Sequence, residues 1–246
     1  IKYLKLNNID VSSMCDIPGG LGLGTSSAYT AAFLKAGLVY KKKKINKNTL
    51  ASKTCLIEIS KLNQKIGKQD QYATVFGGFN KIIFKKNNKT KIKKYSFSKK
   101  FLHNFYRNSL LIYVGDPRSS SKLLKVQNQN LKLKNYQESL QVLSALTDRF
   151  INHFIKADFK NAGKIMDLSW QIKKKLNKNI SNKKIDKIYR DFMNKGAYGG
   201  KLLGAGSGGF IFLFLPEKLK KNFKKSKDRL NYIDFEISNE GTSKIL

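Results

Sequence analysis

The sequence predicts a mixed α+β protein with two domains, residues 1–104 and 105–246, that meet near residues 100 to 108. The first part alternates short apolar segments with glycine-rich loops and helix-like stretches. In the second part, long segments carry apolar residues three and four positions apart, which is the spacing of one face of an α-helix. Two compact apolar segments, Ser109–Gly115 and Gly209–Leu215, have the length of buried strands.

The first domain is expected to begin with a strand and to continue with two helices and a hairpin. Its elements are a strand at Leu4–Ser12, helices at Ser26–Tyr40 and Asn48–Leu62, and strands at Asn80–Phe84 and Ile92–Phe97. The first helix is rich in alanine, which suits close packing, and Thr25 or Ser26 suits its start. Thr49 is a suitable N-cap for the second helix. Asn87 and Asn88 favour a turn between the two strands.

The second domain is expected to open with a strand and to be dominated by long helices. Its elements are the strand Ser109–Gly115, helices at Leu140–Ala157, Ala162–Leu176 and Ser181–Lys195, and strands at Gly209–Leu215 and Tyr232–Ile237. Ser181 and Asn182 are suitable caps for the third helix because their side chains can accept a backbone hydrogen bond.

The chain is strongly basic, with 49 Lys and Arg residues against 16 Asp and Glu residues and a formal net charge of +33. Such a charge gains affinity for nucleic acids by displacing counterions from phosphates. Only five of the basic residues are arginine, however, and base reading favours the two-pronged arginine side chain. The lysines accompany asparagine and isoleucine throughout the chain, so we interpret them as solvated surface and compositional bias. The charge therefore does not predict a nucleic-acid partner.

Cys15 and Cys55 are too few for a disulfide framework, and we expect a reducing cytoplasm. No apolar run approaches the roughly 20 residues needed to cross a bilayer, so no membrane partner is expected. The chain starts at Ile1 without an initiator methionine or a signal peptide. We therefore expect a piece of a longer protein that lacks its N-terminal segment. The sequence does not decide whether the protein forms a homo-oligomer.

A glycine-rich loop at Pro18–Ala28 is the strongest functional signal in the sequence. Glycines let backbone N–H groups converge on an anion, and the start of the following helix adds partial positive charge. The loop lacks the Gly-Lys-Ser/Thr ending of a Walker loop, and its glycine spacing does not match a dinucleotide fingerprint. It predicts a phosphate site of another kind, and the alternative is an ordinary turn that leads into a helix.

A second dense series of glycines occurs at Gly199–Gly209, just before an apolar segment. A tight helix-to-strand connection with a glycine cap would explain Gly199 or Gly200 but not the glycines from Gly204 onward. We therefore expect this loop to approach a ligand or the first loop closely.

Two of the 16 acidic residues of this chain stand out after the first glycine loop. Glu58 falls on the second predicted helix, and Asp70 follows it. One could hold a metal ion and the other could orient a hydroxyl group, which are the requirements of phosphoryl transfer to an alcohol. The alternative for Glu58 is a cap or an ion pair with a lysine such as Lys61.

Together these segments resemble the GHMP kinases, the family of galactokinase, homoserine kinase, mevalonate kinase and phosphomevalonate kinase. The loop at Pro18–Ala28 is similar to the family's phosphate loop, Gly199–Gly209 to its third motif, and Gly67–Ala73 to the segment that bears the catalytic aspartate. The resemblance implies two α+β domains, the first like domain 2 of ribosomal protein S5 and the second ferredoxin-like. It also implies a kinase that uses ATP and Mg²⁺.

The resemblance implies a role for each matching residue. Asp70 would be catalytic, and Ser26 and Glu58 would ligate Mg²⁺. The nucleotide would be bound by Pro18, Gly19, Gly20, Gly22, Leu23, Gly24, Thr25, Ser26 and Ser27 of the first loop and by Gly204, Ala205, Gly206, Ser207 and Gly208 of the second. The acceptor would be contacted by Asp70, Gln71, Tyr72, Arg118 and Gly206.

Within the family, residues Ile66–Asn80 look most like the bacterial D-glycero-D-manno-heptose 7-phosphate kinases, which phosphorylate the anomeric hydroxyl. Arg118 with Ser119, Ser120 and Ser121 would suit the substrate's phosphate, or these residues form only a turn. The alternatives for the whole chain are a kinase for another sugar, such as galactose or fucose, a kinase for a different alcohol, a catalytically inactive relative, or a basic nucleic-acid-binding protein.

Overall fold

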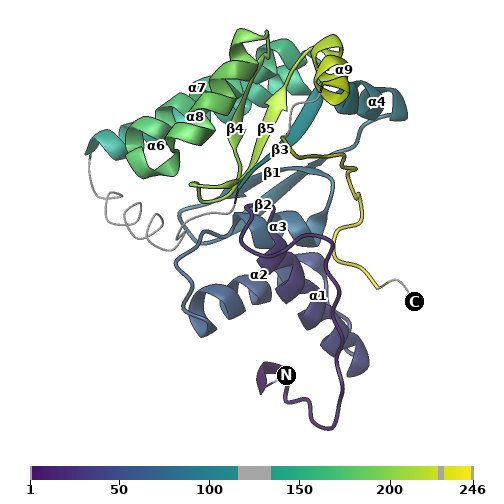
Figure 1. The fold of residues 1–246 in the computed structure, drawn as a ribbon. Helices are drawn as coiled ribbons and strands as arrows, with labels where there is room; N and C mark the ends of the chain where they lie inside the picture. The colour runs from purple at the N-terminus through teal and green to yellow at the C-terminus, as the bar shows by residue number, and fades with distance from the viewer. Residues whose placement is uncertain (1, 116–133, 227–229, 245–246) are drawn as a thin grey trace. The chain divides into compact units, whose positions relative to one another are not determined.

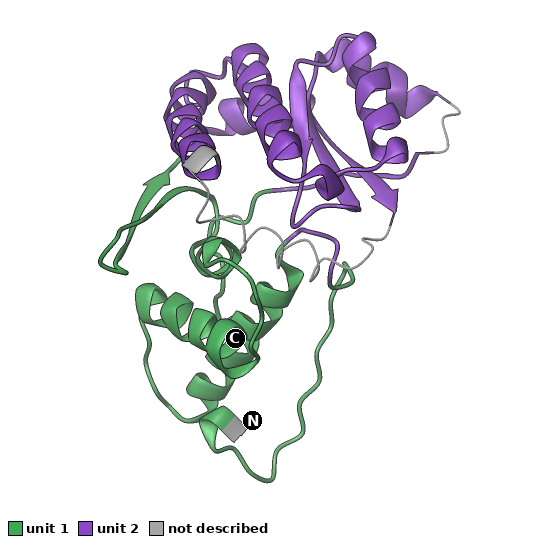
Figure 2. Ribbon diagram, turned by 90° about the vertical axis from the view of Figure 1, so that its left-hand side faces the viewer, with its two compact units in different colours: residues 1–19, 24–96, 237–246 green, residues 20–23, 97–236 purple. Residues whose placement is uncertain are grey.

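The computed structural model describes residues 2–115, 134–226 and 230–244 and divides into two compact units. Figure 1 shows the elements, and Figure 2 shows the units in separate colours. Unit 1 comprises residues 1–19, 24–96 and 237–246, and unit 2 comprises residues 20–23 and 97–236. Each unit therefore contains segments that are distant in the sequence, whereas the division expected after residue 104 followed chain order.

Unit 1 is a group of helices with a β-hairpin. Its elements are a 3₁₀ turn at Lys2–Leu4, α1 at Thr25–Tyr40, α2 at Lys47–Cys55, a π-helical segment at Leu56–Lys61, α3 at Gln69–Phe76, β1 at Phe79–Phe84 and β2 at Thr90–Tyr95. Leu34 of α1, Leu50 of α2 and Val75 of α3 meet in its core. The two strands pair antiparallel, with Ile82 opposite Ile92. The expected hairpin and the expected first helix are confirmed.

Two local expectations for unit 1 are wrong. The strand expected at Leu4–Ser12 is not formed, because Lys5 and Asn8 have positive φ angles of 50° and 53°, which an extended strand does not accept. The N-cap of α2 is Asn46, whose side chain accepts the backbone N–H of Thr49 at 2.8 Å, so the cap lies three residues before the one expected.

The C-terminal residues 237–244 return to the end of α3 and to β2 within unit 1. Gly78 donates its backbone N–H to the carbonyl of Ser238 at 2.7 Å, and the Lys94 ammonium donates to the carbonyl of Asn239 at 2.8 Å. Gly241, at φ 65°, packs against the backbone of residues 75–77 so closely that a side chain would collide with it. The end of the chain therefore supports the helix that carries Asp70.

Unit 2 is a four-stranded antiparallel sheet with helices. Its strands are β3 at Ser109–Gly115, β4 at Gly199–Leu202, β5 at Gly209–Phe214 and β6 at Tyr232–Ile233, in the order β4-β5-β3-β6. Its helices are α4 at Lys99–Arg107, α6 at Lys134–Phe154, α7 at Phe159–Leu176, α8 at Lys183–Asn194 and α9 at Glu217–Lys225, with a 3₁₀ turn at Lys178–Ile180. The units together confirm the α+β class.

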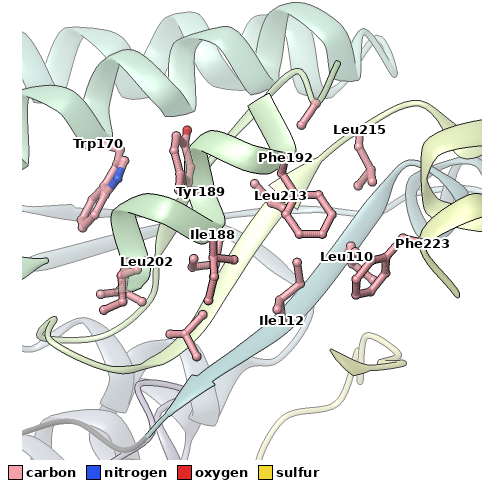
Figure 3. Close-up of a cluster of buried hydrophobic side chains, with 14 residues drawn as sticks. Leu110, Ile112, Trp170, Ile188, Tyr189, Phe192, Leu202, Leu213, Leu215 and Phe223 are labelled. Atoms are coloured by element: carbon pink, nitrogen blue, oxygen red, sulfur yellow. The ribbon is translucent and has the colours of Figure 1, made fainter. Parts of the chain in front are cut away.

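The core of unit 2 lies between these helices and the sheet. Figure 3 shows Trp170 of α7 and Ile188 of α8 beside apolar side chains of the strands, such as Leu213 of β5. Trp170 is the single tryptophan of the chain and is 1% exposed. Its fluorescence therefore reports the folding of unit 2. Among the described helices, none is both long and apolar enough to cross a bilayer.

Helices α4 and α9 were not expected from the sequence. Both are short and rich in lysine, so their pattern is typical of solvated segments. Each buries one phenylalanine, Phe105 in α4 and Phe223 in α9. The strand expected at Tyr232–Ile237 is reduced to Tyr232–Ile233, because the chain leaves unit 2 after residue 236.

Asp158 caps α7, and its loss is expected to lower the free energy of unfolding of unit 2. Its carboxylate accepts the backbone N–H of Asn161 at 3.1 Å, the side-chain amide of Asn161 at 2.8 Å and His153 Nδ1 at 2.8 Å. These hydrogen bonds, those from Asn161 foremost, lower the pKa of Asp158 to about 2. Asp158→Ala should cost about 1 kcal/mol at pH 7, measured by urea unfolding with Trp170 fluorescence.

The pH dependence has a definite sign. The folded pKa of Asp158 lies below its unfolded value, so the stabilisation is fully present above about pH 4 and is lost as the pH falls toward 2. The difference between wild type and Asp158→Ala should therefore shrink between pH 5 and pH 2. Asp191→Ala, at an exposed position of α8, is the control and should change stability by less than about 0.5 kcal/mol. A stability difference between wild type and Asp158→Ala that stays constant with pH would contradict the assignment of Asp158 as the ionised cap of α7.

Candidate active site

The start of α1 has the geometry of an anion site. Gly24 precedes the helix with a left-handed backbone, φ 74° and ψ 15°, and as a glycine it provides no side-chain cap. The first N–H groups of a helix have no partner within the helix, and they lie at the positive end of its dipole. The conformation of Gly24 is one that glycine adopts without strain, so the sequence favours this turn. An external acceptor such as a phosphate fits here.

Glu58 forms the polar centre of unit 1. Its side chain is 0% exposed and lies on the π-helical segment that continues α2. Oε1 accepts the hydroxyls of Ser26 at 2.7 Å and Thr30 at 3.3 Å, and Oε2 accepts the hydroxyl of Ser27 at 2.7 Å and the amide of Gln71 at 2.5 Å. Three elements therefore converge on one carboxylate.

The surroundings of Glu58 provide donors but no cation. None of the ion pairs within the described ranges includes Glu58, so the alternative of a pair with Lys61 is not realised. One turn earlier, burial raises the pKa of the Cys55 thiol to about 11, which keeps it neutral. Burial of a charge is costly unless an opposite charge or several hydrogen bonds compensate it. A cation beside the exposed Ser26 would complete this site.

The residues present fit Mg²⁺ that arrives with a nucleotide. Within the residues that the structure describes, no group of three or more His, Cys, Asp and Glu side chains could hold a metal ion. Mg²⁺ is commonly bound by one or two carboxylates together with substrate phosphates and water rather than by a complete protein cage. Glu58 and the hydroxyl of Ser26, at the start of α1, provide such a partial site.

Asp70 lies beside the same helix start. It stands in the first turn of α3 and is exposed, and a Cβ atom built on Gly24 would lie 3.7 Å from its Cβ and 3.8 Å from its Cγ. The next two residues point into the core. Gln71 is 0% exposed, and Tyr72 is 6% exposed with its hydroxyl 3.1 Å from that of Ser52. Ser26, Glu58 and Asp70, which are distant in the sequence, are thus brought together within unit 1.

The two glycine loops meet within unit 2. A Cβ atom on Gly22 would lie 2.8 Å from the carbonyl oxygen of Leu203, and one on Gly204 would overlap the backbone of Gly22. A Cβ atom on Gly209 would collide with the carbonyl of Leu21. The backbones of the two loops are therefore in close contact. The sequence led us to expect that the second loop approaches either a ligand or the first loop, and the second of these is observed.

Gly206 and Ser207 of the second loop contact other residues of unit 2. Ser207 donates its backbone N–H to the carbonyl of Ile180 at 2.9 Å, and Gly206 packs against Ile180. Before the loop, Tyr189 donates its hydroxyl to Asp167 at 2.7 Å and accepts the N–H of Gly200 at 3.1 Å. Burial, with the bond to Asp167, raises the pKa of Tyr189. The tyrosine therefore anchors β4 just ahead of the glycines.

Two glycines of the first loop are not explained by packing. A Cβ atom on Gly19 or Gly20 would meet nothing within 4 Å. Gly20 has φ 87°, which accounts for a glycine there, whereas the backbone of Gly19 is not in the left-handed region. Pro18 next to them is exposed. Both glycines are exposed.

The predicted residues are thus distributed over both units. Pro18, Gly19, Gly24 to Ser27, Glu58 and Asp70 to Tyr72 belong to unit 1, and Gly20 to Leu23 and Gly204 to Gly208 belong to unit 2. Arg118 and the serines that follow it lie outside the described residues. Sequence reasoning missed Thr30 and the contact of Ser27 and Gln71 with Glu58. The only available signal was that these polar residues stand near apolar positions.

Comparison with known proteins agrees with this geometry. The profile of the GHMP kinases N terminal domain matches residues 1–78, and that of the GHMP kinases C terminal domain matches residues 150–227. The D-glycero-alpha-D-manno-heptose 7-phosphate kinase of Campylobacter jejuni is 28% identical over 92% of this chain and 67% of its own length. The mevalonate kinase of Methanocaldococcus jannaschii is 29% identical over 94% of this chain and 68% of its own length.

Solved structures show the same fold. The crystal structure of the Methanococcus jannaschii mevalonate kinase superposes with a TM-score of 0.65 and 26% identity, covering 88% of this chain and 64% of that one. The chain therefore spans about two thirds of the length of the relatives it matches. Both domain profiles, the fold and the placement of the motifs agree, and the chain belongs to the GHMP kinase family.

Proposed function

We propose that this chain forms the active site of a kinase that transfers the γ-phosphoryl group of ATP to a hydroxyl of a sugar or sugar phosphate. The observation that carries the proposal is the meeting of Ser26, Glu58 and Asp70 at the start of α1. A nucleic-acid-binding protein has no need of a buried carboxylate, a second carboxylate and a glycine-led helix start together. A reducing cytoplasm stays the predicted compartment.

The nucleotide would be held mainly by backbone groups. The N–H groups from Gly24 to Ser27 would donate to its phosphates, and Gly19 leaves room for them. Ser26 and Glu58 would hold Mg²⁺, which when bound neutralises charge on the phosphates. Catalysis in this arrangement comes from position and electrostatics, since the acceptor oxygen and the γ-phosphorus must lie in line.

Asp70 would take the proton of the acceptor. The acceptor oxygen attacks the γ-phosphorus, the bond to the bridging oxygen breaks, ADP leaves, and the hydroxyl proton passes to the carboxylate. An exposed aspartate in the first turn of α3 can reach a bound acceptor. Its position beside Gly24 supports this role.

We propose the anomeric hydroxyl of D-glycero-D-manno-heptose 7-phosphate as the acceptor. The segment at residues 66–80 and the similarity to the Campylobacter jejuni enzyme support this choice. Contacts of Gln71, Tyr72, Arg118 and Gly206 with the acceptor stay predictions. Similarity to a mevalonate kinase at almost equal identity makes mevalonate the principal competitor.

The test is acceptor-dependent release of ADP from Mg·ATP by the protein, expressed with any sequence that precedes residue 1 in its reading frame. The acceptors are heptose 7-phosphate, the unphosphorylated heptose, galactose, fucose and mevalonate. We expect the highest kcat/KM for heptose 7-phosphate and a product that has lost its reducing end. Preference for mevalonate or an unphosphorylated sugar would overturn the acceptor, and folded protein that uses no acceptor would overturn the kinase assignment.

A further inference from the structure

Gln71 has a buried side chain in which the amide nitrogen is hydrogen-bonded and the amide oxygen is not. Its side chain is 0% exposed, and its Nε2 donates to Oε2 of Glu58 at 2.5 Å. Its Oε1 has no hydrogen-bond partner among the residues that the structure describes. An unsatisfied buried acceptor is costly, so an apolar residue of similar length would be the cheaper choice for stability alone. The retained amide therefore points to a role at Glu58.

The two oxygens of Glu58 have different surroundings. Oε2 is held by Gln71 and by Ser27, which is 2% exposed. Oε1 accepts the hydroxyl of Ser26, an exposed residue at the start of α1, at 2.7 Å and that of Thr30 at the longer distance of 3.3 Å. The last torsion of a glutamate side chain is soft, so an unheld carboxylate would rotate. The bonds to Oε2 fix that rotation from the interior and aim Oε1 at the position of Ser26.

We propose that Gln71, together with Ser27, is a positioning residue that orients Glu58 toward the metal ion of the bound nucleotide. This inference rests on the proposed function and adds to it the residues that pre-form the metal site. The amide nitrogen of Gln71 faces Glu58, since a carboxylate oxygen accepts hydrogen bonds and Nε2 is the donor of the amide. Such supporting bonds typically change metal affinity by about 10-fold to 100-fold.

The position of Gln71 next to Asp70 couples the two parts of the site. Consecutive residues of an α-helix point about 100° apart, so one turn of α3 can present Asp70 outward and Gln71 inward. The bond from Gln71 to Glu58 therefore fixes the rotation of the helix that carries Asp70. The first turn of α3 therefore affects both the orientation of Glu58 toward the metal ion and the position of Asp70, the proposed proton acceptor.

The experiment compares binding of a fluorescent ATP analogue with Mg²⁺ and with EDTA, in wild type and in Gln71→Met. Methionine keeps the length of the side chain and removes the donor. We expect the affinity without metal to stay within about twofold of wild type, and the gain in affinity on adding Mg²⁺ to fall by about 10-fold or more. Gln69→Met, at an exposed position of the same helix, is the matched control and should keep the full gain.

The outcomes are distinct. A full gain with Mg²⁺ in Gln71→Met would overturn the inference, and so would an equal loss of affinity with and without metal, which indicates a general structural effect. If Gln71→Met does not fold, Ser27→Ala removes the other donor to the same oxygen and should lower the gain in the same way. Wild-type protein that binds no nucleotide in either condition would overturn the proposed function and the inference with it.

Discussion

Replacement of Asp70 by asparagine is expected to lower kcat for phosphoryl transfer by about 100-fold to 10,000-fold, the range for loss of a general base. Asparagine keeps the size of the side chain and the start of α3 but cannot accept the proton of the acceptor. Since Glu58 is held by Ser26, Ser27, Thr30 and Gln71, which the substitution leaves in place, the affinity for Mg·ATP should change by less than about threefold. Single-turnover ADP formation with nucleotide binding as a second readout separates these effects.

The matched control is Asp191→Asn, an exposed aspartate on α8 of the other unit, which should leave kcat unchanged. If Asp70→Asn kept kcat within about threefold of wild type, Asp70 would not be the proton acceptor, because the remaining rate would exceed what position and electrostatics leave after loss of the base. Loss of Mg·ATP binding in the variant would assign Asp70 to the nucleotide site instead.

Replacement of Gly204 by alanine is expected to destabilise unit 2 by about 2–5 kcal/mol. Overpacking costs about 1–3 kcal/mol, and a left-handed backbone with a side chain costs about 1–2 kcal/mol more. Gly204 has φ 70°, and its Cβ would overlap the backbone of Gly22, which cannot move aside as a flexible side chain could. Urea unfolding followed by Trp170 fluorescence measures this loss, since Trp170 lies in the core of unit 2.

Gly19→Ala is the control for this prediction. A Cβ atom there meets nothing within 4 Å and the backbone is not left-handed, so stability should change by less than about 0.5 kcal/mol. Its nucleotide affinity should nevertheless fall if the open space beside it receives phosphates. Equal stability of Gly204→Ala and Gly19→Ala would show that the two glycine loops do not depend on their close contact.

Local patterns in the sequence predicted the elements that bury a continuous apolar face. The strand Ser109–Gly115 has the predicted bounds, and α7 ends at Leu176 as predicted. Helix α8 is capped by Asn182, whose side chain accepts the N–H of Ile185 at 3.0 Å. These features follow from periodicity and capping, which act over a few residues.

Elements with weak local signals were missed because tertiary contacts decide them. Helix α4 packs through Phe101 and Phe105, and helix α9 packs through Leu219 and Phe223, within segments that are also basic. The strand expected near the N-terminus has no partner strand in the described part of the chain, and Leu4 and Leu6 pack on Gly37 of α1 instead. A strand without a neighbour leaves its backbone groups unpaired, so apolar contact with a helix prevails.

The sequence by itself determined the family and the candidate residues of the site: the glycine loops, Ser26, Glu58 and Asp70, in the order of the family. Only the tertiary structure decided which residues donate hydrogen bonds to each oxygen of Glu58. It also decided that Gly204 contacts Gly22 and that the C-terminal residues 237–244 pack against α3. The physical reason is the separation in the sequence over which each effect acts. Helical periodicity and turn propensity act between near neighbours, whereas a buried hydrogen bond or a backbone contact between distant segments leaves no periodic trace in the sequence.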